Sequence, residues 1–153
     1  MNTKGALALG RQYPASPVVA VSALICDGDR ILLIKRESEP ARGQWSVPGG
    51  VLNLGESLKA GTAREVREET GLTVEVGEAA EVGENIVRDE QGRVLFHYVL
   101  IDYWARPVAG EAAAASDAAE VAWVDWNEAY NYPLTRATRA MLQRWEGDRP
   151  RWT

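Results

Sequence analysis

Three glutamates lie close together in residues 50–72, namely Glu65, Glu68 and Glu69. If this stretch is a helix, Glu69 lies one turn beyond Glu65 and Glu68 lies three residues after it, so the three carboxylates share a face. Like charges at this spacing cost about 0.2–0.5 kcal/mol per pair, and the C-terminal half of a helix disfavours anions. Mg²⁺ prefers carboxylate oxygens and would turn this repulsion into coordination. The alternative is a solvated acidic face, the usual fate of a charge run.

The glutamates belong to a longer pattern of fixed spacing that covers 23 residues. The pattern consists of Gly50, five residues, Glu56, seven residues, Arg64-Glu65-Val66, one residue, Glu68-Glu69, one residue, and Gly71-Leu72. Every fixed position of the signature of the Nudix hydrolase family, also called MutT-related, is filled. The chain therefore resembles that family, and a weaker likeness in the order of strands extends from about residue 18 to residue 145. We call residues 50–72 the box.

The resemblance implies a Mg²⁺-dependent hydrolase of phosphoric anhydrides, in which Mn²⁺ could substitute. Glu65 and Glu69 would be the firmest metal ligands, and Glu68 either a ligand or the base that takes a proton from water. Gly49 would offer its backbone carbonyl to a metal; the alternative is a bare turn glycine. Arg64 would orient the carboxylates, since its fork can hold two oxygens, and the alternative is a surface salt bridge.

Other fixed positions of the box are expected to be structural. Glu56 caps the helix or anchors Arg64, Gly50 shapes the preceding loop, and Gly71 ends the helix as a left-handed cap. Residues 48–50, Pro-Gly-Gly, are read as a tight turn where backbone approaches a ligand closely.

Candidates for substrate recognition lie outside the box. Some family members carry a further acidic group in the loop before the last strand, where this chain has Asp117 and Glu120; the alternative is a solvated loop acid. Arg36 could meet a phosphate, against a solvated loop position. Trp45 could stack on a base, although aromatic residues more often belong to the core. His97 is the only histidine, so a His-based metal site is excluded.

The segments outside the box resemble bacterial family members described as ADP-ribose pyrophosphatases. They are Tyr13-Pro14 and residues 18–21, 45–50 and 97–103. This likeness predicts cleavage of ADP-ribose to AMP and ribose 5-phosphate. Pyrophosphohydrolases of nucleoside triphosphates, such as 8-oxo-dGTP, would keep the same box, and so stay open. A non-catalytic module that binds a nucleotide is a further alternative, but such modules typically lose box carboxylates, and this chain retains them.

Composition restricts the partners and the setting. A chain of 153 residues is long enough for one domain with a real core. A net charge of −5 argues against a nucleic-acid-binding surface and leaves a small nucleotide as the expected partner. The single Cys26 lies in an apolar run and is expected to be an inert thiol. No segment reads as a signal or a membrane span, so we expect no membrane partner and a cytoplasmic protein. Homodimers are common among relatives, and the sequence leaves that state open.

The remaining pattern predicts an α/β fold. Strands are expected at residues 18–25, 30–35, 45–47, 73–87, 94–104 and 121–125, and helices at about 56–70 and 134–145. The resemblance implies an α/β/α sandwich with a mixed sheet between the box helix and the C-terminal helix. We expect a flexible arm at residues 1–12, a Nudix hydrolase domain at 13–146 and a frayed tail at 147–153.

Overall fold

A computed structural model describes residues 11–39 and 41–149 of the chain. Its elements in chain order are β1 (Val18–Asp27), β2 (Arg30–Arg36), β3 (Trp45–Ser46), β4 (Gly49–Val51), α2 (Leu58–Thr70), β5 (Thr73–Arg88), β6 (Val94–Ala109), β7 (Ala118–Asp125), the 3₁₀ helix η1 (Trp126–Asn131) and α3 (Arg136–Arg144). Residues 1–10 of the predicted arm and 150–153 of the predicted tail lie outside the described residues. The domain bounds therefore stay predictions.

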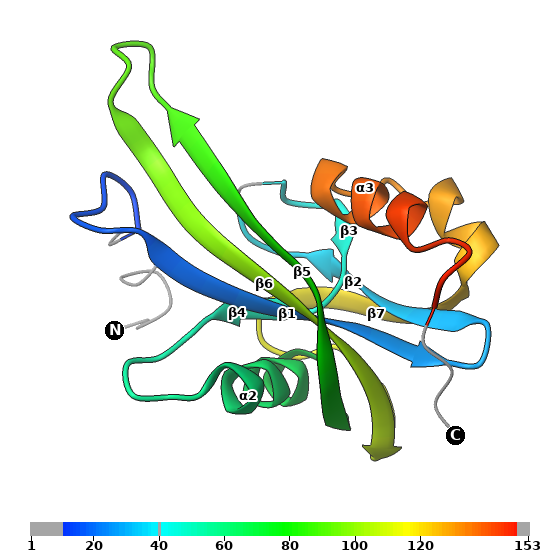
Figure 1. Ribbon diagram of the computed structural model, residues 1–153. Helices are drawn as coiled ribbons and strands as arrows, with labels where there is room; N and C mark the ends of the chain where they lie inside the picture. Colours follow the sequence, from blue (N-terminus) through cyan, green and yellow to red (C-terminus); the bar gives the residue numbers. More distant parts are fainter. Residues whose placement is uncertain (1–10, 40, 150–153) are drawn as a thin grey trace.

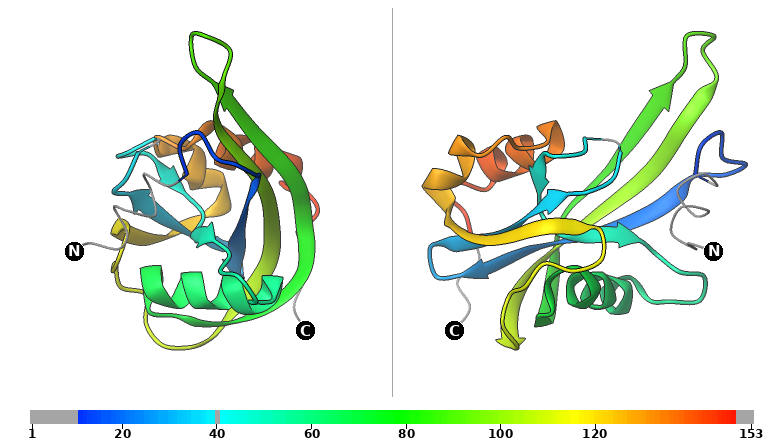
Figure 2. Two further views of the ribbon diagram at one scale, coloured as in Figure 1. Left: turned by 90° about the vertical axis from the view of Figure 1, so that its left-hand side faces the viewer. Right: turned by 180° about the vertical axis from the view of Figure 1, so that it is seen from behind.

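The strands form one mixed sheet between two helical layers. The order is β3-β2-β1-β6-β5, with β4 also paired to β1 and β7 also paired to β2. The β1–β6 pair is parallel and the other pairs are antiparallel. Helix α2 covers one face, and η1 and α3 cover the other (Figures 1 and 2). The predicted α/β/α sandwich is confirmed. No helix in residues 11–39 and 41–149 has the length and apolar character needed to cross a bilayer.

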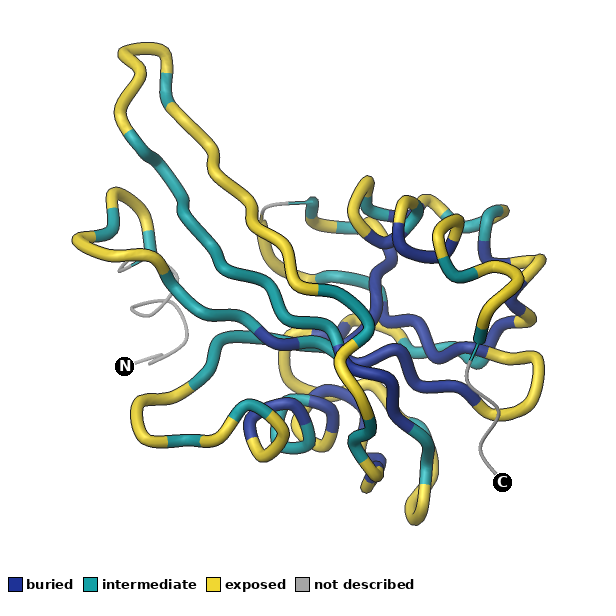
Figure 3. Tube along the Cα trace, viewed as in Figure 1, coloured by how far each residue is buried: buried dark blue, intermediate teal, exposed yellow. Residues whose placement is uncertain are grey.

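Strand β1 supplies both cores, because its side chains alternate between the two faces of the sheet. Ala23 and Ile25 pack with Val66 of α2, whereas Leu24 and Cys26 pack with Leu142 of α3. A strand covered on both faces reads as a continuous apolar run, which is how residues 18–25 appear in the sequence. Figure 3 shows the buried chain concentrated in this central part, while the projecting β5–β6 hairpin is half-buried or exposed.

Helix α2 begins and ends at capping residues that the sequence carries. The Ser57 hydroxyl accepts a hydrogen bond from the Ala60 N–H, which satisfies one free donor of the first turn. Gly71 has φ 74° and donates its N–H to the Arg67 carbonyl at 2.9 Å, as predicted for a left-handed cap. These caps fix which residues form the last two turns, where Glu65, Glu68 and Glu69 lie.

The structure corrects one local prediction. Gly49 and Gly50 are not a turn but part of β4, whose backbone lies so close to β1 that a Cβ on Gly49 would be 2.3 Å from the Val21 carbonyl oxygen. Gly83 lies within β5, opposite Leu100 of β6. In α3, Ala137 is exposed and Thr138 is buried.

Candidate active site

Arg64 is the centre of the polar network on α2. Its Nε donates to Glu56 Oε2 at 2.7 Å and its Nη2 donates to Glu56 Oε1 at 3.0 Å, a bidentate pair. Its Nη1 donates to Glu65 Oε1 at 2.9 Å and to both Glu68 oxygens at 3.2 Å. Nη2 also reaches the Val51 carbonyl oxygen at 3.0 Å. One guanidinium therefore anchors three box carboxylates to each other and to β4.

Glu56 contacts both Arg64 and the backbone of the loop before α2. Besides the pair with Arg64, its Oε1 accepts the backbone N–H of Asn53 at 3.1 Å, which closes the loop before α2. The hydrogen bond from Arg64 holds the pKa of Glu56 below its ordinary value. The carboxylates around Arg64 likewise raise the pKa of its guanidinium, so Arg64 stays charged. The Arg64 side chain is only 26% exposed, which argues against the alternative that it forms a simple surface salt bridge.

Glu69 lies apart from this network, against the sheet. Its side chain is buried, at 5% exposure, and its Oε2 accepts the Gly49 backbone N–H at 3.1 Å. Burial, helped by the charges of Glu65 and Asp117, raises the pKa of Glu69 to about 8, against the opposing effects of the Gly49 N–H and Arg36. The charges of Glu65 and Asp117 therefore act on the buried Glu69, and a nearby cation would relieve this repulsion.

The carboxylates fit a divalent cation by their chemistry, although they are not yet gathered around one point. Within residues 11–39 and 41–149, no three His, Cys, Asp or Glu side chains are close enough together to hold an ion. Glu65 and Glu68 instead share Arg64, and Glu69 holds Gly49. Hard oxygen donors of this kind suit Mg²⁺, and a cation near Glu69 would offset the cost of burying its carboxylate beside the charges of Glu65 and Asp117.

The loop at residues 110–117 lies against the C-terminal end of α2. Its Ala113 and Ala115 N–H groups donate to the carbonyls of Thr70 and Glu69 at 2.9 and 3.1 Å, which satisfies the C-terminal end of α2. The same loop carries Asp117, whose carbonyl accepts the Glu37 N–H at 3.1 Å, next to Arg36. Asp117 and Arg36 both act on the charge of Glu69, so two of the four substrate candidates lie near the box.

The other two substrate candidates lie elsewhere. Trp45 belongs to the core, is 9% exposed and packs edge-on against Tyr132 with ring centroids 5.0 Å apart. The neighbouring side chains cover the ring, which favours the alternative that Trp45 belongs to the core, and stacking on a base stays a prediction. Glu120 is exposed on β7 and pairs with Lys35 at 3.5 Å, an arrangement typical of a solvated surface acid.

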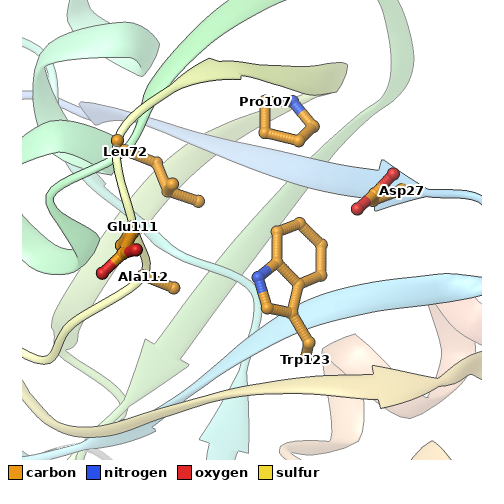
Figure 4. Close-up of a pocket in the computed structure, with 7 residues that line it drawn as sticks. Asp27, Leu72, Pro107, Glu111, Ala112 and Trp123 are labelled. Carbon is orange, nitrogen blue, oxygen red and sulfur yellow. The ribbon is translucent and has the colours of Figure 1, made fainter.

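Two features were not foreseen from the sequence. The Ser22 hydroxyl on β1 donates to Asp102 Oδ1 on β6, and Asp102 has a pKa raised above its ordinary value, chiefly by burial. The signal was an acid within the apolar run of residues 98–105. The second feature is a pocket of about 390 Å³ (Figure 4), lined by Asp27, Leu72, Pro107, Gly110, Glu111, Ala112 and Trp123. None of the predicted site residues lines this pocket.

Comparison with known proteins places these observations in a family. The model of the NUDIX domain matches residues 16–145. The chain is 36% identical over 111 residues to a protein of Methanocaldococcus jannaschii named ADP-ribose pyrophosphatase, covering 72% of this chain but 63% of that protein. It is 28% identical over 127 residues to the CTP pyrophosphohydrolase of Escherichia coli K12, covering 82% of this chain and 89% of that protein.

Solved structures agree with the fold. The crystal structure of a MutT NUDIX hydrolase from Burkholderia pseudomallei superposes with a TM-score of 0.71 at 30% identity, over 84% of this chain and 97% of that one. Hydrolases of this family act on phosphoric anhydride bonds, generally use divalent metal ions and bind small nucleotides.

Proposed function

The chain belongs to the NUDIX domain family, and from that premise we propose that it hydrolyses the diphosphate bond of ADP-ribose to AMP and ribose 5-phosphate with Mg²⁺. The observation that carries the proposal is the clustering of Glu56, Glu65 and Glu68 on Arg64, with Glu69 buried beside them against Gly49. All the charged positions of the box are thus present. Arg64 and the three glutamates that follow it lie on α2, and Glu56 lies in the loop before this helix. A module that only binds nucleotides would not need this complete set.

The chemistry needs charge neutralisation, a positioned water and a base. When bound, Mg²⁺ would neutralise the diphosphate oxygens, and Mn²⁺ could take its place. Glu65, Glu68, Glu69 and the Gly49 carbonyl are the groups we assign to holding it. Glu68 is the most exposed of the box carboxylates that Arg64 holds, at 45%, so it is our candidate for taking the proton from water. The oxygen of that water joins one phosphorus as the anhydride P–O bond breaks.

We prefer ADP-ribose as the substrate because the relative named ADP-ribose pyrophosphatase is 36% identical to this chain. Because the chain matches only 63% of the length of that relative, its activity on ADP-ribose is our proposal for this chain. Hydrolysis of nucleoside triphosphates is the second candidate. It is favoured by the Escherichia coli relative, which is named CTP pyrophosphohydrolase and which the chain matches over 89% of its length.

The test is turnover of a nucleotide panel by wild type and Glu69→Gln, with Mg²⁺ and with a chelator. The panel holds ADP-ribose, CTP and 8-oxo-dGTP, and we expect ADP-ribose to be cleaved fastest. Glu69→Gln should lose at least about 10²-fold in rate, the range for losing a group that stabilises transition-state charge. Glu90→Gln, in the β5–β6 turn, is the matched control and should keep full activity. Equal rates for wild type and Glu69→Gln, or no loss with the chelator, would refute the assignment.

A further inference from the structure

One row of residues crosses the sheet from the box toward β5. Gly49 of β4 pairs with Ser22 of β1, and Ser22 pairs with Asp102 of β6. Ser22 and Asp102 lie two residues before Leu24 and Trp104, which belong to the core cluster under α3, so this row faces the α3 side. Strands in a sheet lie about 4.8 Å apart, so the Gly49 and Asp102 backbones are about 10 Å apart. The box carboxylates lie on the α2 side, but β4 pairs with no described strand other than β1, so a nucleotide whose phosphates lie at Gly49 can pass the edge of β4 and reach Asp102 with its base.

A low floor lies beside this row. Two residues before Ser22 and Asp102 in their strands, Ala20 of β1 pairs with Leu100 of β6, and Leu100 pairs with Gly83 of β5. We call the surface formed by these three residues the floor. Among residues 11–39 and 41–149, no atom beyond Gly83 and its chain neighbours lies within 4 Å of the position that a Cβ on Gly83 would take. Residues 94–102 of β6 are only half-buried, and Figure 3 shows this part of the sheet outside the deeply buried centre. The floor is apolar and open, which suits the flat face of a base.

An aromatic pair borders the floor on its other side. Tyr98 lies two residues beyond Leu100 on the same face, and its ring stacks on Phe96 with centroids 6.1 Å apart and planes 17° apart. The floor is thus flanked by Tyr98 at one side and by the Ser22–Asp102 pair at the other. A planar ligand would lie between an aromatic edge and a carboxylate.

Asp102 keeps one oxygen for a ligand. Ser22 donates to its Oδ1, and no described residue donates a hydrogen bond to its Oδ2. The neighbouring acid, Glu81, is engaged differently, because its Oε1 pairs with Arg144 of α3 at 2.9 Å. A carboxylate oxygen accepts hydrogen bonds and repels a carbonyl oxygen, so its partner on a base is an N–H group.

We propose that Asp102, positioned by Ser22, accepts a hydrogen bond from the exocyclic amino group of the substrate's base, which lies on the Ala20–Leu100–Gly83 floor. The inference rests on the proposed function for the presence of a nucleotide, and it adds the chemical class of the base. Adenine carries such an amino group, whereas hypoxanthine carries a carbonyl in the same place. The enzyme therefore selects amino-bearing bases over their keto counterparts.

The test measures the affinities of the full chain for AMP and IMP by calorimetry in the presence of Mg²⁺. Wild type should bind AMP at least about 10-fold more tightly, the usual size of a hydrogen bond to a charged group. Asp102→Asn should abolish that ratio. The control is Glu84→Gln, an acid of β5 that lies opposite Val99 and so faces the other side, and it should keep the wild-type ratio. A ratio near one in wild type, or an unchanged ratio in Asp102→Asn, would overturn the proposal.

Two further variants keep the test decisive if Asp102→Asn folds poorly. Ser22→Ala removes the hydroxyl that holds Asp102 and should lower the AMP-to-IMP ratio without abolishing it. Gly83→Val fills the floor with a residue that strands favour, and should weaken AMP and IMP alike by at least about 10-fold. Unchanged affinities in Gly83→Val would show that the base lies elsewhere.

A ribose hydroxyl is the other donor that a carboxylate could hold, and 2′-deoxy-AMP separates the two. If Asp102→Asn removes a preference for AMP over 2′-deoxy-AMP and leaves the AMP-to-IMP ratio intact, Asp102 reads the sugar and our assignment is wrong. Binding and turnover also fail separately. Loss of ADP-ribose turnover with an Asp102-dependent preference for AMP would refute the proposed function alone, and turnover without that preference would refute this inference alone.

Discussion

The backbone N–H of Gly49 donates to Oε2 of Glu69 at 3.1 Å, so a main-chain group of β4 is the hydrogen-bond partner of a buried carboxylate on α2. Gly50, the next residue of β4, lies against another box carboxylate, that of Glu65. A Cβ on Gly50 would lie 2.4–2.7 Å from the carboxylate atoms of Glu65. The two glycines of β4 therefore bring backbone and box carboxylates together, and the spacing of the box begins at Gly50 for this reason.

Gly50→Ala should impair activity more than stability. The added methyl group meets the far end of the Glu65 side chain, which can rotate away, so the fold survives while a proposed metal ligand is displaced. We expect turnover of ADP-ribose to fall at least about 10-fold, with a loss of stability below about 1 kcal/mol. Steady-state kinetics and thermal unfolding measure both quantities.

Two alanine variants serve as comparisons for Gly50→Ala. In the described part of the chain, a Cβ on Gly147 meets no atom within 4 Å beyond its chain neighbours, so Gly147→Ala should change neither quantity. Gly49→Ala meets the Val21 carbonyl oxygen at 2.3 Å, a backbone atom that cannot move aside, so stability should fall by about 1–3 kcal/mol. Full activity in Gly50→Ala would show that the position of Glu65 does not matter.

Arg64→Ala should lower stability, because it leaves Glu56 and Glu65 without their cation. These two side chains are 16% and 15% exposed, so their charges are poorly solvated once Arg64 is gone. We expect a loss of about 2 kcal/mol, below the cost of breaking a fully buried pair, and a melting temperature roughly 5 °C lower. Arg67→Ala, an exposed position on the same helix, is the control and should stay near wild type. Similar melting curves for the two variants would mean that Arg64 only lies on the surface.

The sequence predicted the box helix well because its ends and its charges are local properties. Gly71 can adopt the left-handed cap that few other residues tolerate, and the spacing of Glu65, Glu68 and Glu69 follows from helical geometry alone. The expected roles of the site residues themselves stay proposals. The sequence was less informative at positions whose burial or partner depends on residues distant in sequence.

Trp45 and Asp102 illustrate those distant contacts. Trp45 is covered by Tyr132, which follows it by more than eighty residues, so no local pattern could reveal its burial. The partner of Asp102 is Ser22, also eighty residues away, and the parallel pairing of β1 with β6 brings them together. Gly49 was taken for a turn residue because a glycine needed for close backbone approach in a strand looks the same in sequence.

The thiol of Cys26 should be inert in the folded protein. It is 6% exposed within the core, and burial raises its pKa to about 11, so almost no reactive thiolate is present at pH 8. A thiol reagent such as iodoacetamide should label the native protein at pH 8 at least about 10²-fold more slowly than the unfolded protein in urea. Mass spectrometry of the labelled chain measures both rates. Rapid labelling without urea would mean that this part of the core opens readily.

Asp102→Asn should stabilise the protein at neutral pH, in the absence of nucleotide, and have little effect in acid. Burial, with a smaller contribution from Glu81, raises the pKa of Asp102 above its ordinary value, although the Ser22 hydroxyl acts in the opposite direction. The folded protein therefore holds this proton more tightly than the unfolded chain. Stability from Asp102 is full below about pH 4, where both states are protonated, and is lost as pH rises through the folded pKa.

Asparagine carries no charge, so the variant avoids this loss, and its amide oxygen can still accept the Ser22 hydroxyl. Urea unfolding measured from pH 3 to pH 8 gives the free energy of unfolding of both proteins. The two values should agree in acid and diverge as the pH rises, with Asp102→Asn the more stable. Glu81 and Arg144 face the same region from β5 and α3, so Glu81→Gln is measured in parallel to isolate the contribution of Asp102. If wild type were the more stable protein at pH 8, the charged carboxylate would be stabilised in place. The cost of burying Asp102, which we connect with ligand recognition, would then not exist.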